Sequence, residues 1–149
     1  RDLEQPLKDI VASGKPFLGI CLGLQILFDR SDEGQEPGLG IIPGVVHKFQ
    51  PEIDLTIPQM GWNQLHLTQP HCQLWGDIGT NAWVYFDHSY YVEPSLSSVS
   101  AATVTHGSQT VTAAIAQANV MAVQFHPEKS STIGLRILAN FVRVGMKKL

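Results

Sequence analysis

The stretch Gly19-Ile20-Cys21-Leu22-Gly23 decides how this chain folds and where its chemistry lies. An apolar run from Pro16 to Ile20 precedes the cysteine, and a helical pattern from Leu22 to Arg30 follows it. A strand, a sharp turn and a helix in this order are typical of a nucleophile elbow, which holds a reactive side chain on a strained turn. The two glycines leave room for the turn because they have no Cβ. The stretch therefore predicts a cysteine nucleophile.

A second motif, His126-Pro127-Glu128, follows 105 residues after Cys21, at the end of an apolar run that predicts a buried strand from Val120 to Phe125. The proline fixes the bend between the imidazole and the carboxylate, so the carboxylate can orient one ring nitrogen while the other faces a thiol. Each motif alone also fits a purely structural role, since buried cysteines and strand-ending histidines are common. Together the motifs favour a nucleophile, base and orienting acid.

The helix predicted after Cys21 also bears on the reactivity of the thiol. Unpaired N–H groups and the positive end of the helix dipole stabilise a thiolate at the amino end of a helix. We therefore expect the pKa of Cys21 to be lowered.

The remaining patterns predict alternating helices and strands at the two ends of the chain, with a β-rich middle. We expect an α/β fold with an antiparallel addition. A final helix is expected to begin at a cap formed by Ser130 or Ser131. Residues 50–82 give no clear pattern apart from a short strand at 65–67. The other expected elements are a helix over 1–13, strands over 45–49 and 83–92, and a hairpin formed by 99–105 and 109–116.

Composition sets the broad class of the protein. The chain has 149 residues, 44% of them hydrophobic and 15% charged, which describes one globular domain rather than a disordered chain. A net charge of −3 without a basic run does not favour nucleic-acid binding. No apolar stretch approaches the roughly 18 to 20 residues that cross a membrane. Cys21 and Cys72 have neither disulfide-scaffold nor metal-site spacing, so we expect a cytoplasmic protein without a metal.

The chain begins at Arg1 with a helical pattern and no earlier strand. We therefore expect residues 1–149 to form a single domain that is incomplete at its N-terminus.

The quoted motifs resemble class I glutamine amidotransferases, and within them the glutaminase subunits of imidazole glycerol phosphate synthases. The resemblance spans nearly the whole chain and implies a flavodoxin-like, three-layer, mostly parallel sheet with antiparallel additions, its N-terminal strands missing. The narrower similarity is carried by Gly19-Ile20-Cys21-Leu22-Gly23-Leu24-Gln25, Met60-Gly61-Trp62-Asn63, His88-Ser89-Tyr90-Tyr91 and Gln124-Phe125-His126-Pro127-Glu128-Lys129-Ser130.

This resemblance implies an enzyme that hydrolyses L-glutamine to glutamate and ammonia without a cofactor. Cys21 would attack the side-chain amide and form a γ-glutamyl thioester, His126 would carry the proton, and Glu128 would orient His126. The N–H of Leu22 would meet the oxyanion. The family's second oxyanion donor lies in a Pro-Gly-Val-Gly type loop before the elbow, and no such loop precedes Cys21 in this sequence.

The resemblance also implies binding residues that the sequence alone would treat as structural. Ammonia would pass to the cyclase subunit, a barrel, in a heterodimer that makes imidazole glycerol phosphate and an aminoimidazole carboxamide ribotide in histidine biosynthesis. The expected glutamine-binding residues are Gln25, His88, Ser89 and Tyr90. The expected partner-binding residues are Trp62, Asn63, Tyr85 and Lys129.

Two other interpretations stay open from the sequence. One is a class I amidotransferase that serves another acceptor. The other is an inactive fragment that keeps the partner-binding surface without a complete oxyanion hole.

Overall fold

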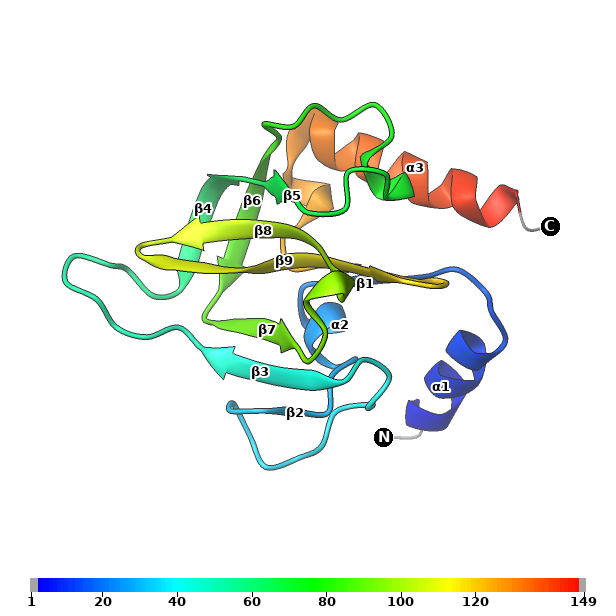
Figure 1. The fold of residues 1–149 in the computed structure, drawn as a ribbon, viewed down its shortest axis with the longest axis horizontal. Helices are drawn as coiled ribbons and strands as arrows, with labels where there is room; N and C mark the ends of the chain where they lie inside the picture. Colours follow the sequence, from blue (N-terminus) through cyan, green and yellow to red (C-terminus); the bar gives the residue numbers. More distant parts are fainter. Residues whose placement is uncertain (1–2, 148–149) are drawn as a thin grey trace.

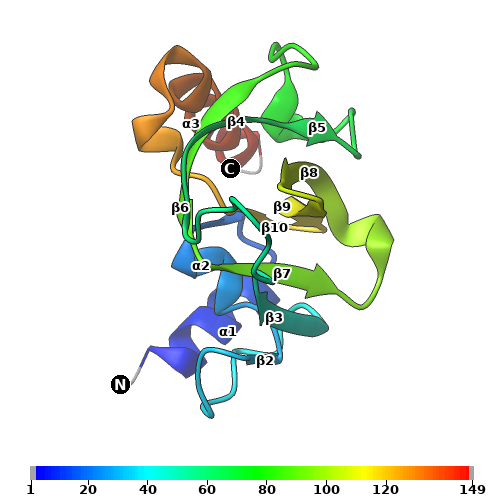
Figure 2. The same cartoon turned by 90° about the vertical axis from the view of Figure 1, so that its left-hand side faces the viewer.

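A large sheet lies between two helical layers in the computed structural model, which describes residues 3–147 (Figure 1). Helices α1 (Glu4–Ala12) and α2 (Leu22–Gln25) cover one face, and α3 (Ser131–Met146) covers the other. Figure 2 shows the same division from the side, with α3 at the top and the two other helices below. The predicted α/β class is confirmed. None of the helices in this part of the chain is both long and apolar enough to span a bilayer.

The large sheet has the strand order β1-β10-β9-β7-β3-β2, with β8 on β9 and β5 on β8. The pairs β1–β10 and β2–β3 are parallel, and the other pairs in this sheet are antiparallel. Strands β4 and β6 form a separate antiparallel pair. The strands are β1 (Phe17–Ile20), β2 (Arg30–Ser31), β3 (Gly44–Lys48), β4 (Gln59–Gln64), β5 (His66–Leu67), β6 (Trp83–His88), β7 (Tyr90–Pro94), β8 (Ser100–His106), β9 (Gln109–Gln117) and β10 (Val120–Val123). Short 3-10 turns lie at Gln73–Trp75, Ser97–Val99 and Pro127–Lys129.

Strand β10 lies in the middle of the core. All four of its residues are buried. Met121 and Val123 join the apolar cluster under α3, whereas Val120 and Ala122 join the cluster that contains Leu24 of α2. This alternation follows from the two-residue repeat of a strand, and it makes β10 a firm support for its parallel neighbour β1.

The helix after Cys21 is shorter than predicted, because it ends at Gln25 instead of Arg30. The carbonyl of Ile26 accepts the N–H of Leu39, and the carbonyl of Leu27 accepts from the following loop in the same way. These contacts use the carbonyls that would otherwise continue the helix. Gly38 allows the close approach, since a Cβ there would lie 1.9 Å from the Phe28 carbonyl oxygen. Arg30 begins strand β2 instead.

The middle of the chain differs from the prediction in two places. The predicted strand over 83–92 is two strands, β6 and β7, which belong to different sheets and are separated at Ser89. Strand β4, which the sequence did not predict, pairs along its whole length with β6. The predicted hairpin is confirmed as β8 and β9, and the predicted short strand as β5.

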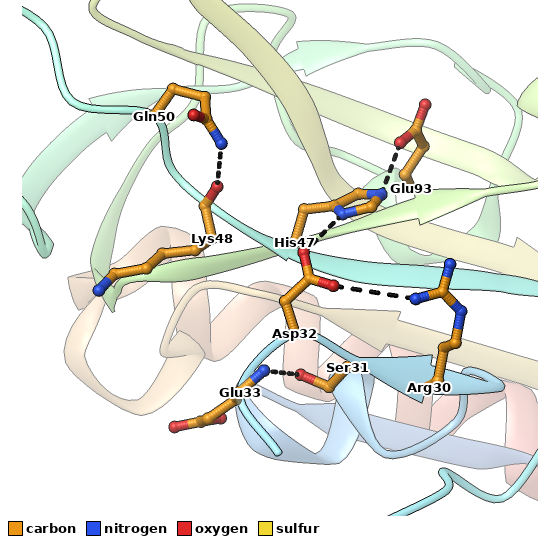
Figure 3. Close-up of polar contacts among 8 residues, drawn as sticks. All are labelled: Arg30, Ser31, Asp32, Glu33, His47, Lys48, Gln50 and Glu93. Carbon is orange, nitrogen blue, oxygen red and sulfur yellow. Dashed lines mark hydrogen bonds and ion pairs between the residues drawn. The ribbon is translucent and has the colours of Figure 1, made fainter. Parts of the chain in front are cut away.

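A polar cluster fastens the β2 edge of the large sheet (Figure 3). His47 on β3 lies between two carboxylates, with Nδ1 2.8 Å from Asp32 Oδ2 and Nε2 3.0 Å from Glu93 Oε2. Arg30 lies 3.9 Å from the other oxygen of Asp32. The cluster therefore ties β7, β3 and the residues around β2 together through side chains as well as backbone hydrogen bonds.

Candidate active site

Cys21 lies on a sharp turn between β1 and α2. Its backbone has φ 52° and ψ −108°, a left-handed value of φ that non-glycine residues seldom adopt. The Cys21 N–H donates to the carbonyl of Val123 at 2.8 Å, so β10 holds the turn in place. A Cβ on Gly19 would lie 2.4 Å from the Gly23 carbonyl oxygen. The strand, turn and helix predicted from the sequence are therefore present, and Gly19 is required where the helix folds back on β1.

The histidine motif leaves the neighbouring strand at the same edge. Ile20 pairs with Val123 in parallel register, so the chain segments after these two residues emerge side by side. His126 donates its N–H to the Tyr85 carbonyl at 2.9 Å, and its Nδ1 lies 2.7 Å from Glu128 Oε1. The fold thus brings Cys21 and the His126–Glu128 pair to the carboxyl ends of adjacent parallel strands.

Ser130 supports this arrangement. The sequence predicted a cap of α3 by Ser130 or Ser131, and this prediction is wrong. No side-chain cap bond is present at the start of α3. The Ser130 hydroxyl instead donates to the His126 carbonyl at 2.6 Å and accepts the Tyr85 N–H at 2.9 Å. Ser130 therefore joins the His126 turn to β6.

The predicted lowering of the Cys21 pKa is wrong. Burial raises the pKa of the thiol, and this effect outweighs the hydrogen bond from the Leu22 N–H. The Asp87 and Glu128 carboxylates raise the pKa of Cys21 further, whereas a hydrogen bond from Gln124 lowers it. Helix α2 has only four residues, so its dipole is small. A thiol in this setting would need a base to accept its proton before it could act as a nucleophile.

Gln25 connects Tyr90 to Gln124. Its side-chain Nε2 donates to the Tyr90 carbonyl at 3.2 Å and to Gln124 Oε1 at 3.1 Å. Gln124 Nε2 in turn lies 3.8 Å from the Cys21 sulfur. The Gln25 side chain is thus part of a polar chain that ends at the thiol. Ser89 precedes Tyr90 in the sequence, and its carbonyl accepts the Phe49 N–H at 3.0 Å.

His88 is buried, and both of its ring nitrogens have partners within the protein. Nδ1 lies 2.7 Å from the Tyr90 carbonyl, and Nε2 lies 2.8 Å from Gln59 Oε1. A carbonyl only accepts, so Nδ1 carries the proton. A neutral ring then accepts at Nε2, which requires the Gln59 amide to be turned so that its NH₂, otherwise buried without a partner, faces the ring. The side chain therefore holds the Ser89–Tyr90 turn and has no nitrogen to offer a ligand.

Burial lowers the pKa of His88 to about 4, from 6.5. The unfolded chain therefore binds this proton near pH 6.5 and the folded chain only near pH 4. Between these values the unfolded state holds more protons, so the free energy of unfolding falls by about 3 kcal/mol as the pH drops through this window. Urea titrations from pH 7 to pH 4 measure the fall. A His88→Gln variant should show a smaller fall, and the exposed His66→Gln variant should keep the wild-type slope; equal slopes for all three proteins would contradict this prediction.

Three of the four expected partner-binding residues meet on the outer face of the β4–β6 pair. The rings of Trp62 and Tyr85 pack edge to face with centroids 6.1 Å apart, and Lys129 Nζ lies 5.8 Å from the Tyr85 centroid. Asn63 is on the other face of β4, where its Nδ2 donates to the Thr105 carbonyl at 2.8 Å. We call Trp62, Tyr85 and Lys129 the aromatic face.

A cavity of about 280 Å³ opens beside α2. Leu22 and Gln25 line it close to Cys21 in the sequence, and Arg30, Glu33 and Glu36 contribute charges. The sequence pattern did not single out Arg30 or Glu33, because Arg30 is the last residue of the predicted helix and Glu33 follows it in a polar loop.

Gln124 and Gln59 are both buried, and neither was predicted from the sequence as a site residue. A signal for Gln124 was present, since it is a polar residue inside the apolar run before His126, and buried amides need partners. Gln59 had no such signal, because the strand that carries it was not recognised.

Two solved structures that this chain resembles in fold are described as glutamine amidotransferases. One, described as a glutamine amidotransferase, is 19% identical with a TM-score of 0.66 and matches 97% of this chain and 68% of its own. A glutamine amidotransferase from Thermotoga maritima is 16% identical with a TM-score of 0.63 and matches 97% of this chain and 54% of its own. These similarities show the fold.

Much more similar relatives are described as imidazole glycerol phosphate synthase subunit HisH. The protein from Trichodesmium erythraeum is 68% identical over 142 residues, 95% of this chain and 66% of the relative. The protein from Nostoc punctiforme is 65% identical over 149 residues, 100% of this chain and 71% of the relative. The chain thus spans about two thirds of the length of these relatives. The family model for class-I glutamine amidotransferases matches residues 2–144, and this chain belongs to that family.

Proposed function

We propose that this chain is a glutaminase that hydrolyses L-glutamine and supplies ammonia to the cyclase subunit of imidazole glycerol phosphate synthase. The observation that carries the proposal is the placement of Cys21 on a strained turn beside the His126–Glu128 pair, at the ends of two parallel strands. The identity of 65–68% with the two HisH subunits supports this acceptor and does not favour another one.

The first step is attack of the Cys21 sulfur on the side-chain carbonyl carbon of glutamine. Because burial raises the pKa of Cys21, the thiol gives its proton to Nε2 of His126 as the S–C bond forms. Glu128 holds the other ring nitrogen and stabilises the imidazolium. The Leu22 N–H, which faces the sulfur, meets the negative charge that develops on the carbonyl oxygen.

The second step releases ammonia and then glutamate. His126 passes its proton to the amide nitrogen, the C–N bond breaks, and a γ-glutamyl thioester remains on Cys21. A water molecule that gives a proton to His126 then attacks the thioester carbon. The C–S bond breaks, the sulfur recovers the proton, and glutamate leaves.

The cavity beside α2 suits the α-amino acid end of glutamine. The carboxylate of Glu33 matches the substrate's ammonium group, and the guanidinium of Arg30 matches its carboxylate. Gln25 lines this cavity and donates to the Tyr90 carbonyl at 3.2 Å, which links the cavity to the Ser89–Tyr90 turn. In this proposal His88 acts by fixing that turn.

The aromatic face is the proposed docking site for the cyclase subunit. It combines an exposed tryptophan with a cation over a tyrosine ring, a composition typical of binding hot spots. The face lies on the strand pair that also bonds His126 and Ser130, so it is joined to the site. The free thiols Cys21 and Cys72 suit a reducing compartment, which supports a cytoplasmic location.

Replacing Trp62 with alanine should weaken cyclase binding by about 2 kcal/mol, or roughly 30-fold in Kd, because the ring is 51% exposed in the unbound chain and would be buried on binding. Titration calorimetry with the cyclase subunit measures the loss. Leu135→Ala is the matched control, since Leu135 is a 61% exposed apolar residue on α3, away from the aromatic face. Equal affinities of the Trp62 and Leu135 variants would place the docking surface elsewhere.

Mass spectrometry of the intact chain after incubation with L-glutamine and the cyclase subunit tests the glutaminase proposal. A γ-glutamyl adduct on Cys21, with release of glutamate and ammonia, is the expected result. A folded chain that binds the cyclase subunit yet shows neither adduct nor ammonia would favour the inactive partner-binding fragment.

A further inference from the structure

Gln124 is a buried amide next to Cys21, and no step of the proposed reaction uses it. It follows β10 directly, is 0% exposed, and donates its backbone N–H to the Ala113 carbonyl at 2.8 Å. An apolar residue would fit this position between packed strands at a lower desolvation cost. The amide therefore needs an explanation in terms of what its two polar atoms contact.

Both polar atoms of the Gln124 side chain face groups of the site. Its Oε1 lies 3.1 Å from Gln25 Nε2, and its Nε2 lies 3.8 Å from the Cys21 sulfur. Hydrogen bonds to sulfur are longer than those to oxygen, so the second contact is an N–H donated to the thiol.

The direction of this polar chain is set by one backbone carbonyl. The Tyr90 oxygen can only accept, so the Gln25 atom 3.2 Å from it must be the NH₂ nitrogen. That same nitrogen faces Gln124, which must present its oxygen to Gln25 and therefore its NH₂ to the sulfur. The Tyr90 carbonyl also fixes the His88 tautomer, so one oxygen aligns both polar groups next to it.

We propose that Gln124 is a positioning residue that holds the Cys21 sulfur and stabilises its thiolate form, with the amide oriented by Tyr90 through Gln25. The inference rests on the proposed function only for the role of Cys21 as the nucleophile. An amide does not titrate, so the N–H remains available to the sulfur at every pH at which the chain is folded.

The charged surroundings of the thiol show why such a donor is needed. The carboxylates of Asp87 on β6 and of Glu128 both disfavour the thiolate and raise the pKa of Cys21, and burial raises this pKa more strongly. Within the described residues, the Leu22 N–H and Gln124 are the groups that lower the pKa of Cys21. His126, in its protonated form, adds a positive charge on the same edge of the sheet.

The test is the rate at which iodoacetamide alkylates Cys21 as a function of pH, with Cys72 in the same chain as the internal reference. Gln124→Met keeps the length of the side chain and removes the N–H. We expect the Cys21 pKa to rise by about one unit. Below the pKa the rate should fall about threefold, and above it the rate should rise about threefold, because a more basic thiolate is a better nucleophile.

The proposal is supported if the Cys21 alkylation profiles of the wild type and Gln124→Met cross as the pH rises, while the Cys72 profiles are the same in both proteins. General loosening of the core would instead increase the alkylation rates of both cysteines at every pH. A folded Gln124→Met variant whose Cys21 profile matches the wild type would overturn the proposal.

If Gln124→Met does not fold, Gln25→Met decides the question, because it leaves Gln124 without its orienting partner. This variant should raise the Cys21 pKa by less than one unit. No change in the Cys21 pKa would overturn the proposal.

This readout is separate from the glutaminase test. Alkylation needs only a reactive sulfur, so the shift can be measured even if the chain forms no thioester. A shift without thioester formation would therefore leave the positioning role standing while the proposed function failed.

Discussion

Cys21→Ala is expected to abolish the γ-glutamyl adduct and to lower glutamine hydrolysis by on the order of 10⁴-fold or more. The structure gives the reason. Among the described residues, Cys21 and Cys72 are the two free thiols, and Cys21 alone follows β1 on the turn beside the His126 motif. An alanine at this position keeps the backbone and removes the atom that forms the bond. Intact-mass measurement and ammonia release give the two readouts.

Cys72→Ala is the matched control for this experiment. Cys72 is also partly exposed and also has a pKa raised by burial, but it lies on a loop before Gln73 that packs against the α3 side of the core. This variant should form the adduct at the wild-type rate. An undiminished adduct in Cys21→Ala would reject the assignment of the nucleophile.

Gly134→Ala is expected to destabilise the chain and to displace the His126 turn. A Cβ at Gly134 would lie 1.8 Å from the Pro127 carbonyl oxygen and 2.8 Å from the Ser130 Cβ. Neither neighbour can move alone, because Ser130 bonds both His126 and Tyr85. We expect the free energy of unfolding to fall by about 1–3 kcal/mol, as in overpacked cores, and glutamine hydrolysis to fall with it.

Gly145→Ala tests the same substitution in the same helix without the clash. A Cβ at Gly145 would meet nothing within 4 Å, so alanine should stabilise α3 by about 0.5–1 kcal/mol and leave hydrolysis unchanged. Urea denaturation and ammonia release compare the two variants. A Gly134 variant as stable and as active as the Gly145 variant would show that the turn tolerates movement of α3.

The sequence was most informative where side-chain pattern and backbone geometry agree. The strand before Cys21, the buried strand before Gln124, the β8–β9 hairpin and the final helix were all predictable from apolar runs and turn residues. Strand β4 was not, because Gln59-Met60-Gly61-Trp62-Asn63-Gln64 has low strand propensity and becomes a strand through its pairing with β6. The early end of α2 likewise depends on a loop that returns to its carbonyls.

The residues of the site could be located from sequence more easily than their electrostatics. Two motifs at the ends of buried strands were enough to place Cys21 near His126. The direction of the Cys21 pKa shift was not predictable, since it depends on the balance between burial and a four-residue helix. The roles of His88 and Gln59 depend on a contact between two strands, one of which the sequence did not reveal.

The left-handed backbone of Cys21 links the stability of the chain to its reactivity. A non-glycine residue at φ 52° costs on the order of 1–3 kcal/mol, which the pairing of β1 with β10 must offset when the chain folds. In the proposed function, the fold itself therefore holds Cys21 in its reacting conformation. The same arrangement makes the elbow depend on the β1–β10 pairing, because a weaker pairing would remove the support that holds Cys21 at a positive φ.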